Sequence, residues 1–574
     1  MMKHKSIYNE LGDERKKLQA EGKLPLWVTT PAWQILKDKY TTPEHPDLYS
    51  IYKRISKAAA SHMGKEEEHY QKIFFNLMWN GWLACSTPVL ANMGDKGGCP
   101  VSCSGSYIED NIFDFYDSQK EAAVLTKNGF GTSSYLGEIR ERGTTISSGG
   151  VASGVLPVLK DFVQLSRDVS QGNTRRGAWA GYLEIDHGDF YELAEYVKNH
   201  PDDCNVGWLI SNDFISKLDS GDEDSVERYQ KAMKLKMLTG KGYFVFIDKM
   251  NEANPPMYKE HGLSVKASNL CTEITLHSSE FYTFTCVLSS MNLAKYDEWK
   301  DTDAVELATW FLDGVMQEFI DKSNGKDSLR RTHQHAKKGR ALGLGVMGWH
   351  SFLQQKGLPF NSIASTAHTH NIFSDIRTKA EKASMALAQE YGEPLWCKGT
   401  GMRNTHLLAV APTVSNSVIC GGISAGIEPL PANIYTFNGA KGTFIRKNKV
   451  LQEILIAKNE DKDQWWDQML DQDGSAQGLP DNILSPEEKE LFLTFPEINQ
   501  LELVRQAALR QRYIDQTQSL NLSFDPSDSP KWINQVHIEA WKLGVKTLYY
   551  LRTDSVIKGD LGSRTAEDCI SCDG

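Results

Sequence analysis

The sequence predicts an α/β protein with a helical N-terminal region and a flexible C-terminal tail. Strand-like runs such as 242–247 and 341–346 alternate with helical segments between Ser86 and Leu430, which is the pattern of an α/β architecture. The first ninety residues instead show mainly helical spacing of apolar side chains, above all from Leu48 to Trp82. We therefore expect a helical region at 1–85, an α/β domain with C-terminal helical additions at 86–552, and a tail at 553–574.

The C-terminal end of the α/β domain predicts a helix, a strand and then the tail. Ser529-Pro530 suits an N-cap followed by a first-turn proline, and Gly544 suits the stop after the helix. A strand is expected from Val545 to Leu551. After Arg552 the chain has almost no large apolar residues, so it should be mobile. The roughly seventeen residues from there to Cys569 could extend about 55 to 60 Å.

Composition excludes several classes of protein. The chain has 574 residues and a net charge of -11, which argues against general nucleic-acid binding. No run of about 18 apolar residues occurs, so we expect no membrane span. The start, Met1 to Lys5, lacks the apolar core of a secretory signal and favours the cytoplasm. In that reducing compartment the ten cysteines should be free, redox-active or catalytic thiols, because structural disulfides are rare there.

Three segments place cysteines where chemistry is plausible. In 268–273 the apolar and polar residues alternate, and on a strand Asn269, Cys271 and Glu273 would share one face. For a lone Cys-X-Glu, a packed cysteine and a surface carboxylate would be the commoner interpretation. Cys286 lies in the strand-like run 282–288, and Cys103 lies far upstream.

A Cys-X-X-Cys pair, Cys569 and Cys572, ends the chain. On a mobile tail, it could exchange electrons with buried thiols. The alternative is half of a structural zinc site, which needs four ligands, and no second partnered pair is evident. We therefore expect no metal site in this chain.

These features, together with Tyr549-Tyr550 after the run 542–548, resemble the large catalytic subunit of class I ribonucleotide reductase. The resemblance extends from about Ser86 to Gly574. It implies a ten-stranded α/β barrel with a radical cysteine on a central loop. It also implies that the chain reduces ribonucleoside diphosphates to deoxyribonucleotides.

The resemblance assigns a role to each thiol of the barrel. Cys271 matches the cysteine that becomes a thiyl radical and removes the 3′-hydrogen of the nucleotide. Glu273 matches the base at the 3′-hydroxyl, and Asn269 a ligand of the substrate hydroxyls. Cys103 and Cys286 match the pair that supplies two electrons and a proton as the 2′-hydroxyl leaves, and becomes a disulfide.

Radical supply and re-reduction are expected to come from other proteins. In the family, Tyr549 and Tyr550 match two phenols that relay the radical from a separate, metal-containing small subunit. An ideal strand would point them to opposite faces, so the family's stacked arrangement requires a departure from strand geometry. Cys569 and Cys572 match a shuttle reduced by a thioredoxin- or glutaredoxin-type protein. No cofactor is expected to be bound covalently, and a homodimer is expected.

A phosphate-binding loop is predicted at 411–417, where a loop opens a helix with free backbone N–H groups and short hydroxyl side chains. A plain N-cap is the alternative. The resemblance implies that a glycine, Gly131, lies against the sugar. It also implies that the substrate diphosphate is held by Thr87, Ser102, Pro412, Thr413, Val414, Ser415 and Asn416.

An effector site is also implied. The segment 170–178 resembles the specificity loop, with Arg175 and Arg176, and Asp110 and Arg140 match effector-binding positions for a deoxynucleotide or ATP. The N-terminus shows no recognisable signature of the nucleotide-binding cone that many family members carry. We therefore expect regulation of specificity without the on/off control by ATP and dATP.

Two alternatives remain open from the sequence. An adenosylcobalamin-dependent ribonucleotide reductase shares the barrel thiols but makes its radical within one chain and needs no tyrosine relay. A non-catalytic thiol or zinc-binding protein would use the cysteines without chemistry on a nucleotide.

Overall fold

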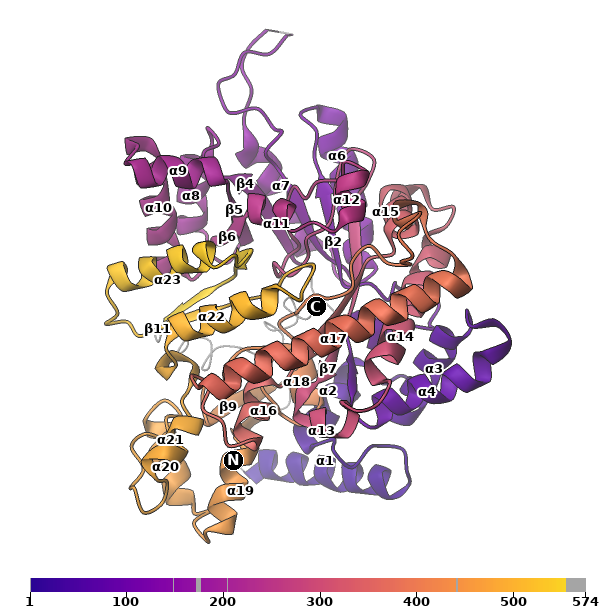
Figure 1. Ribbon diagram of the computed structural model, residues 1–574, viewed down its shortest axis with the longest axis vertical. Helices are drawn as coiled ribbons and strands as arrows, with labels where there is room; N and C mark the ends of the chain where they lie inside the picture. Colours follow the sequence, from indigo (N-terminus) through magenta and orange to yellow (C-terminus); the bar gives the residue numbers. More distant parts are fainter. Residues whose placement is uncertain (1, 148, 172–176, 204, 440–441, 554–574) are drawn as a thin grey trace.

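A curled sheet surrounded by helices forms the centre of the protein (Figure 1). The structure is a computed structural model that describes residues 2–147, 149–171, 177–203, 205–439 and 442–553. The strands are β1 (Leu83–Cys85), β2 (Cys103–Tyr107), β3 (Gly131–Tyr135), β4 (Trp179–Glu184), β5 (Asn205–Ile210), β6 (Tyr243–Phe246), β7 (Phe284–Asn292), β8 (Leu342–Met347), β9 (Ile434–Gly439), β10 (Gly442–Lys447), β11 (Leu522–Phe524), β12 (Thr547–Leu548) and β13 (Leu551–Thr553).

The main sheet has the order β1-β7-β2-β3-β4-β5-β6-β12, with β8 paired to β7. Strands β2 to β6 are parallel, and β7 runs antiparallel to β2 but parallel to β8. The strands predicted at 242–247 and 341–346 are confirmed as β6 and β8. The α/β class is therefore confirmed.

Two extended segments, 406–410 and 516–520, continue the wall between β8 and β12. The backbone amide of Leu344 donates to Leu407 (2.8 Å), and that of Val410 donates to Thr517 (3.0 Å). Single bridges join β8 to the first segment and the first segment to the second. The predicted count of ten strands is not confirmed, because the main sheet of the described residues has nine and these segments form no regular strands.

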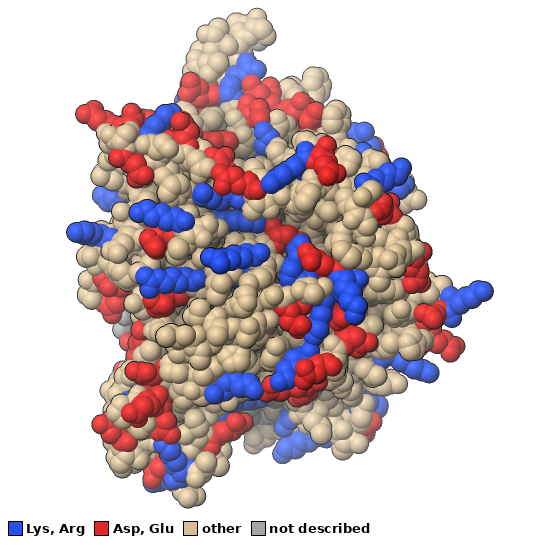
Figure 2. All heavy atoms as spheres, viewed as in Figure 1, with Lys and Arg blue, Asp and Glu red and all other residues tan. Residues whose placement is uncertain are grey.

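Helices cover the outside of the sheet (Figure 1). They are α1 (Met2–Ala20), α2 (Thr30–Lys39), α3 (Leu48–Ala60), α4 (Glu67–Trp79), α5 (Thr87–Asn92), α6 (Ile112–Lys127), α7 (Val155–Asp168), α8 (Phe190–Asn199), α9 (Asn212–Ser220), α10 (Glu223–Thr239), α11 (Ile247–Glu252), α12 (Pro256–Glu260), α13 (Tyr296–Trp299), α14 (Ala304–Ser323), α15 (Arg330–Gly339), α16 (Trp349–Gln355), α17 (Ile363–Tyr391), α18 (Val414–Ile419), α19 (Lys449–Ala457), α20 (Asp463–Asp471), α21 (Pro486–Leu491), α22 (Gln500–Gln511) and α23 (Pro530–Lys542). None of these described helices combines the length and the apolar character needed to span a bilayer. Acidic and basic side chains are interspersed over the face in Figure 2.

The predicted helical N-terminal region is confirmed as α1 to α4. The stretch from Leu48 to Trp82 is not one helix, because the chain turns at Gly64, where φ is +58°. Helices α3 and α4 pack against each other and against α14. The Tyr70 ring stacks on Trp310 of α14, with centroids 5.2 Å apart. This region therefore shares one hydrophobic core with the helices that cover the sheet.

The C-terminal helix is confirmed as α23, and Ser529 caps it by accepting a hydrogen bond from the Trp532 amide at 3.2 Å. Gly544 follows it with φ +85°. The single strand predicted from Val545 to Leu551 is wrong. It is interrupted at Tyr549 and Tyr550, which lie between β12 and β13.

A buried ion pair fixes the entry into β8. The Asp313 carboxylate accepts bidentate hydrogen bonds from Arg340, at 2.9 Å each, and another from Arg403 at 3.0 Å. Burial alone would raise the pKa of Asp313, but the two guanidinium groups outweigh it and lower that pKa to about 2. This cluster joins α14 to the start of β8 and to the segment before 406–410, so it helps to position the barrel wall.

We expect Asp313→Asn to lower the free energy of unfolding by about 3 to 5 kcal/mol, because it leaves buried guanidinium charges uncompensated. Since the folded pKa is depressed, the contribution of Asp313 is present above pH ~4 and is lost as the pH falls toward 2. Denaturant titration of both proteins across this range measures it. Asp321→Asn on the same helix, whose side chain is 56% exposed, should cost no more than about 0.5 kcal/mol.

Candidate active site

The segment 268–273 is a turn and not the predicted strand. Thr272 has φ +66°, and its amide donates to the Asn269 carbonyl at 3.3 Å. The Asn269 side chain accepts from the Ile274 amide at 3.1 Å. A short polar side chain that bonds its own backbone favours a turn over a strand. The alternation in the sequence therefore reflects polar residues that are buried in a turn, and Asn269 is one of them because its side chain bonds the loop backbone.

This turn lies inside the barrel, because strands on different walls bind its backbone. Ser133 on β3 donates to the Ser268 carbonyl at 2.8 Å. Thr547 on β12 donates to the Thr272 carbonyl at 3.2 Å, and the Ser519 hydroxyl donates to the Cys271 carbonyl. A segment held from several walls has little freedom to move. We call residues 268–275 the central loop.

Two thiols face each other on neighbouring strands. Cys103 on β2 and Cys286 on β7 are direct partners in an antiparallel register, so their side chains share one face of the sheet. Direct antiparallel partners have Cα atoms about 4.5 to 5.5 Å apart. A disulfide requires about 4.4 to 6.8 Å. The two thiols are therefore placed for reversible oxidation.

The predicted amide and carboxylate lie beside this pair. Asn269 Nδ2 is 3.1 Å from Cys103 Sγ, and Cys103 Sγ is 4.0 Å from Glu273 Oε1. The Ser519 hydroxyl donates to Glu273 Oε2 at 3.1 Å. The same-face argument for a strand is wrong, yet the turn still brings Asn269 and Glu273 to Cys103. Cys271 is fully buried on the same loop.

Burial keeps the Cys286 thiol protonated. It raises the pKa of Cys286 well above its ordinary value, and the hydrogen bond from Gln516 Nε2 to Cys286 Sγ at 3.3 Å offsets this only in part. A neutral thiol is a poor nucleophile but retains a hydrogen to donate. The arrangement suits transfer of hydrogen and electrons better than thiolate attack.

Three phenols meet at the break between β12 and β13. The ring centroids of Tyr549 and Tyr550 lie 4.1 Å apart, so the expected departure from strand geometry is present. Tyr243 on β6 lies 4.7 Å from the Tyr549 ring and donates from its hydroxyl to the Tyr550 hydroxyl at 3.0 Å. Tyr549 belongs to the same buried cluster as Cys271. Tyr243 was not predicted as a site residue, because in the sequence it is an ordinary member of the apolar run that forms β6.

The predicted substrate-binding residues lie on, or directly follow, elements of the wall that carries the thiol pair. Ser102 precedes Cys103, and Gly131 on β3 is the register partner of Cys103. Thr87 begins α5 just after β1, and β1 pairs with β7. The hydroxyl groups of Thr87 and Tyr40 are hydrogen-bonded at 3.1 Å. The predicted loop and helix at 411–417 are confirmed as the loop before α18. Pro412, Thr413, Val414, Ser415 and Asn416 follow directly on the wall segment 406–410.

The predicted effector residues lie at the other end of β2. Asp110 follows β2, Arg140 follows β3, and their side chains form an ion pair. Arg175 and Arg176 lie outside the described residues, as do Cys569 and Cys572 of the tail. Among the described residues, no cluster of three or more His, Cys, Asp or Glu side chains could hold a metal.

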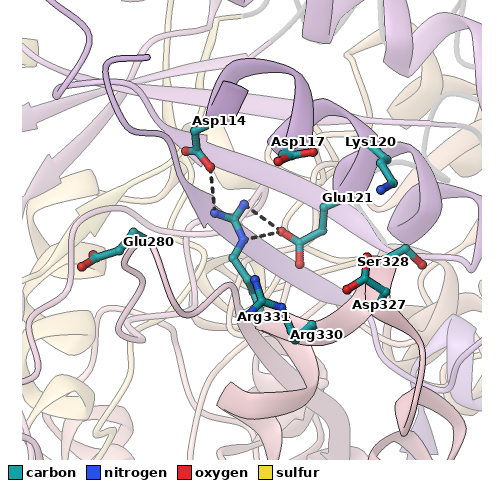
Figure 3. Close-up of a pocket in the computed structure, with 9 residues that line it drawn as sticks. All are labelled: Asp114, Asp117, Lys120, Glu121, Glu280, Asp327, Ser328, Arg330 and Arg331. Atoms are coloured by element: carbon teal, nitrogen blue, oxygen red, sulfur yellow. Dashed lines mark hydrogen bonds and ion pairs between the residues drawn. The ribbon is translucent and has the colours of Figure 1, made fainter. Parts of the chain in front are cut away.

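A charged pocket beside α6 contains none of the predicted residues (Figure 3). Arg331 reaches across it to Glu121 at 2.9 Å and to Asp114 at 3.4 Å. The Arg331 guanidinium is therefore already paired with carboxylates of the protein, and we assign this pocket no part in the active site.

The barrel matches a known family along most of its length. The family described as "Ribonucleotide reductase, barrel domain" matches residues 101–227, 225–398 and 396–551. The ribonucleoside-diphosphate reductase large subunit of Invertebrate iridescent virus 3 is 30% identical over 629 aligned positions, which cover 94% of this chain and 97% of the viral protein. A putative ribonucleoside-diphosphate reductase large subunit of Frog virus 3 (isolate Goorha) is 32% identical, with 95% and 99% covered.

Solved structures give the same result. The alpha subunit of the class Id ribonucleotide reductase of Actinobacillus ureae superimposes with a TM-score of 0.86. It is 38% identical in sequence, and the match covers 92% of this chain and 97% of that one.

We expect mild oxidation of the isolated chain to join Cys103 to Cys286, because their register satisfies the geometry of a disulfide. Peptide mapping without reduction should give one linked peptide that contains both, and a dithiol should release it. Cys286→Ser is the control and should remove the product. A link from Cys103 to Cys271 would contradict the assignment of the pair.

Proposed function

Because the chain belongs to the ribonucleotide reductase family, as a ribonucleoside-diphosphate reductase large subunit, we propose that Cys271 carries the radical that starts the reduction of ribose. One observation carries this proposal. Cys271 lies buried on the central loop, and that loop brings Asn269 and Glu273 to Cys103 of the opposed thiol pair. No other group of described cysteines has a carboxylate and an amide placed in this way.

The comparisons decide between the alternatives left by the sequence. Family membership excludes a non-catalytic thiol or zinc-binding protein. The adenosylcobalamin-dependent reductase gains no support, because the relatives are named as large or alpha subunits of a reductase with more than one kind of subunit.

The first step breaks the C3′–H bond of the ribose. The Cys271 thiyl takes this hydrogen atom and becomes a thiol, and the unpaired electron stays on C3′. Glu273 accepts the proton of the 3′-hydroxyl, which requires hydrogen-bond reach to that group. Asn269 orients the hydroxyls. The hydrogen bond from Ser519 holds the Glu273 carboxylate in place for this step.

The second step removes the 2′-hydroxyl as water. Together, Cys103 and Cys286 supply two protons and two electrons, and their sulfurs form a disulfide. One proton leaves with the 2′-oxygen as water, and the other hydrogen forms the new C2′–H bond. Glu273 returns its proton to the 3′-oxygen. Cys271 then returns a hydrogen atom to C3′, and the thiyl radical is regenerated. The raised pKa of Cys286 favours this chemistry, because the thiol retains its proton until the hydroxyl leaves.

The radical reaches Cys271 through Tyr550 and then Tyr549. Tyr550 is half-buried, whereas Tyr549 is only 1% exposed and shares the buried cluster of Cys271. The phenol closer to the surface is thus the entry point. A metal-containing small subunit supplies the oxidising equivalent when it is bound to this chain.

The disulfide is reduced through Cys569 and Cys572 by a thioredoxin- or glutaredoxin-type protein. The seven described cysteines are all buried, so none of them offers an outside reductant direct access. A pair on the C-terminal segment is the sequence's best candidate for the carrier.

Nucleotides occupy two separate sites in this proposal. The diphosphate of the substrate binds between Thr87, Ser102 and the loop before α18. A deoxynucleotide or ATP effector binds near Asp110 and Arg140, with Arg175 and Arg176, and β2 connects this site to Cys103.

We expect Cys271→Ser to abolish the reduction of cytidine diphosphate, because a serine O–H bond is too strong to yield the required radical. Reduction is measured in the presence and absence of the cognate small subunit. The unaltered chain should be active only with that subunit, and the variant should still bind the nucleotide with unchanged affinity. Turnover by the variant, or by the unaltered chain alone, would contradict the proposal.

Tyr549→Phe and Tyr550→Phe should each silence the enzyme, because a phenyl ring has no O–H bond to break. Circular dichroism and the melting temperature should stay unchanged, which separates this loss from unfolding. Tyr229→Phe is the matched control, since Tyr229 is also buried and hydrogen-bonded, to Asn534 at 2.8 Å, but lies outside the relay. Full activity in either relay variant would remove the relay.

A further inference from the structure

A buried lysine without a charged partner hydrogen-bonds the backbone of the two adjacent tyrosines. Lys236 on α10 is 0% exposed, and among the described residues no carboxylate pairs with it. Its ammonium group donates to the Gly242 carbonyl at 3.0 Å and to the Tyr549 carbonyl. Burial lowers the pKa of Lys236 to about 7. Because burying a lysine in this way is unfavourable, its two backbone contacts require an explanation.

The backbone groups of the two tyrosines give that explanation. The Tyr549 amide donates to the Leu520 carbonyl at 2.8 Å, and the Leu522 amide donates to the Tyr550 carbonyl at 3.0 Å. The Tyr549 carbonyl and the Tyr550 amide, which belong to the peptide between the two residues, instead have side-chain partners. Lys236 donates to the Tyr549 carbonyl, and Asn521 Oδ1 accepts from the Tyr550 amide at 3.0 Å.

Side chains have therefore replaced sheet partners at the peptide that joins the two tyrosines. In a regular strand, neighbouring residues point to opposite faces, so the two rings could not meet. Here the ring centroids lie 4.1 Å apart. A strand can be interrupted in the buried core only if its polar backbone groups find other partners. The Lys236 amine meets this need in either protonation state, because both forms carry N–H donors.

We propose that Lys236 is a positioning residue for the radical relay, which holds the rings of Tyr549 and Tyr550 in contact by binding the carbonyl of the peptide that joins them. The inference rests on the proposed relay. In the transfer step that Lys236 would support, the Tyr549 O–H bond breaks and a new O–H bond forms on the Tyr550 phenoxyl. One electron and one proton thus pass from Tyr549 to Tyr550, and the radical passes from Tyr550 to Tyr549. That exchange depends on the contact of the two phenols.

The test uses the full chain with its small subunit. Lys236→Met keeps the length of the side chain but removes every donor, and Lys236→Arg restores donors. We expect kcat for cytidine diphosphate to fall about tenfold or more in the methionine variant, because a buried carbonyl is left unpaired. KM should change by less than about twofold, and the arginine variant should recover part of kcat.

A radical trap distinguishes a loss of contact between the two tyrosines from a general disturbance of the fold. With 3-aminotyrosine, which is oxidised more easily than tyrosine, in place of Tyr550, electron paramagnetic resonance should show an undiminished radical in Lys236→Met. With the same trap in place of Tyr549, the signal should fall in parallel with kcat. Leu235→Ala controls for loss of packing on α10, since Leu235 is buried and precedes Lys236 in the sequence but its side chain has no hydrogen-bond donor for the Tyr549 carbonyl. This variant should leave both trapped signals intact.

Two results would overturn the inference. The first is a kcat of Lys236→Met equal to that of the unaltered chain. The second is a trapped-radical signal that, in Lys236→Met, falls as much with the trap at position 550 as with the trap at position 549. A fall of the same size in Leu235→Ala would count in the same way. If these occur while Tyr549→Phe and Tyr550→Phe are inactive, the relay stands and only the role of Lys236 fails. If the phenylalanine variants are active, the relay itself fails.

Discussion

The hydrogen bonds that hold the central loop inside the barrel are the constraint on which the site depends. Ser133 and Thr547 bind the backbone of this loop from different walls, and Ser519 binds both the Cys271 carbonyl and the Glu273 side chain. Because the loop has no ladder of its own, these contacts replace the partners that a strand would have had. They fix a thiol and a carboxylate in a space from which bulk water is excluded. A thiyl radical needs such a setting, since any mobile hydrogen donor nearby would quench it.

Strand β2 connects the thiol pair to the proposed effector site. It begins at Cys103, which opposes Cys286, and the chain reaches Asp110 a few residues beyond its other end. Strand β3 runs beside it in parallel, from Gly131 next to Cys103 toward Arg140. A nucleotide bound near the ion pair would therefore act on two strands whose opposite ends border the thiols. Close-packed strands transmit small displacements because they cannot deform independently.

Local patterns in the sequence predicted the elements that depend on local interactions. The cap at Ser529, the apolar run of β6 and the helical N-terminal region follow from residues close together in the chain. The strand predicted at 268–273 was wrong because its alternation has another cause, the self-bonding of Asn269 in a buried turn. The places of Tyr243 and Lys236 could not be predicted, since their hydrogen-bond partners Tyr550 and Tyr549 are 307 and 313 residues away. The resemblance to a known family identified Cys103 and Cys286 as a pair, which spacing alone could not do.

Burial explains why the proposed mechanism divides its redox chemistry between two places. Cys103 and Cys286 are 1% and 0% exposed, so a disulfide between them is closed to any folded reductant. The same burial raises the pKa of Cys286 and keeps its hydrogen available for the leaving hydroxyl. A more exposed pair would be easier to reduce but would lose its proton more readily and admit water beside the radical. In the proposed mechanism, a second pair of thiols therefore carries electrons inward. The C-terminal segment is suited to this, because the roughly sixteen residues from Thr553 to Cys569 could span about 55 Å when extended.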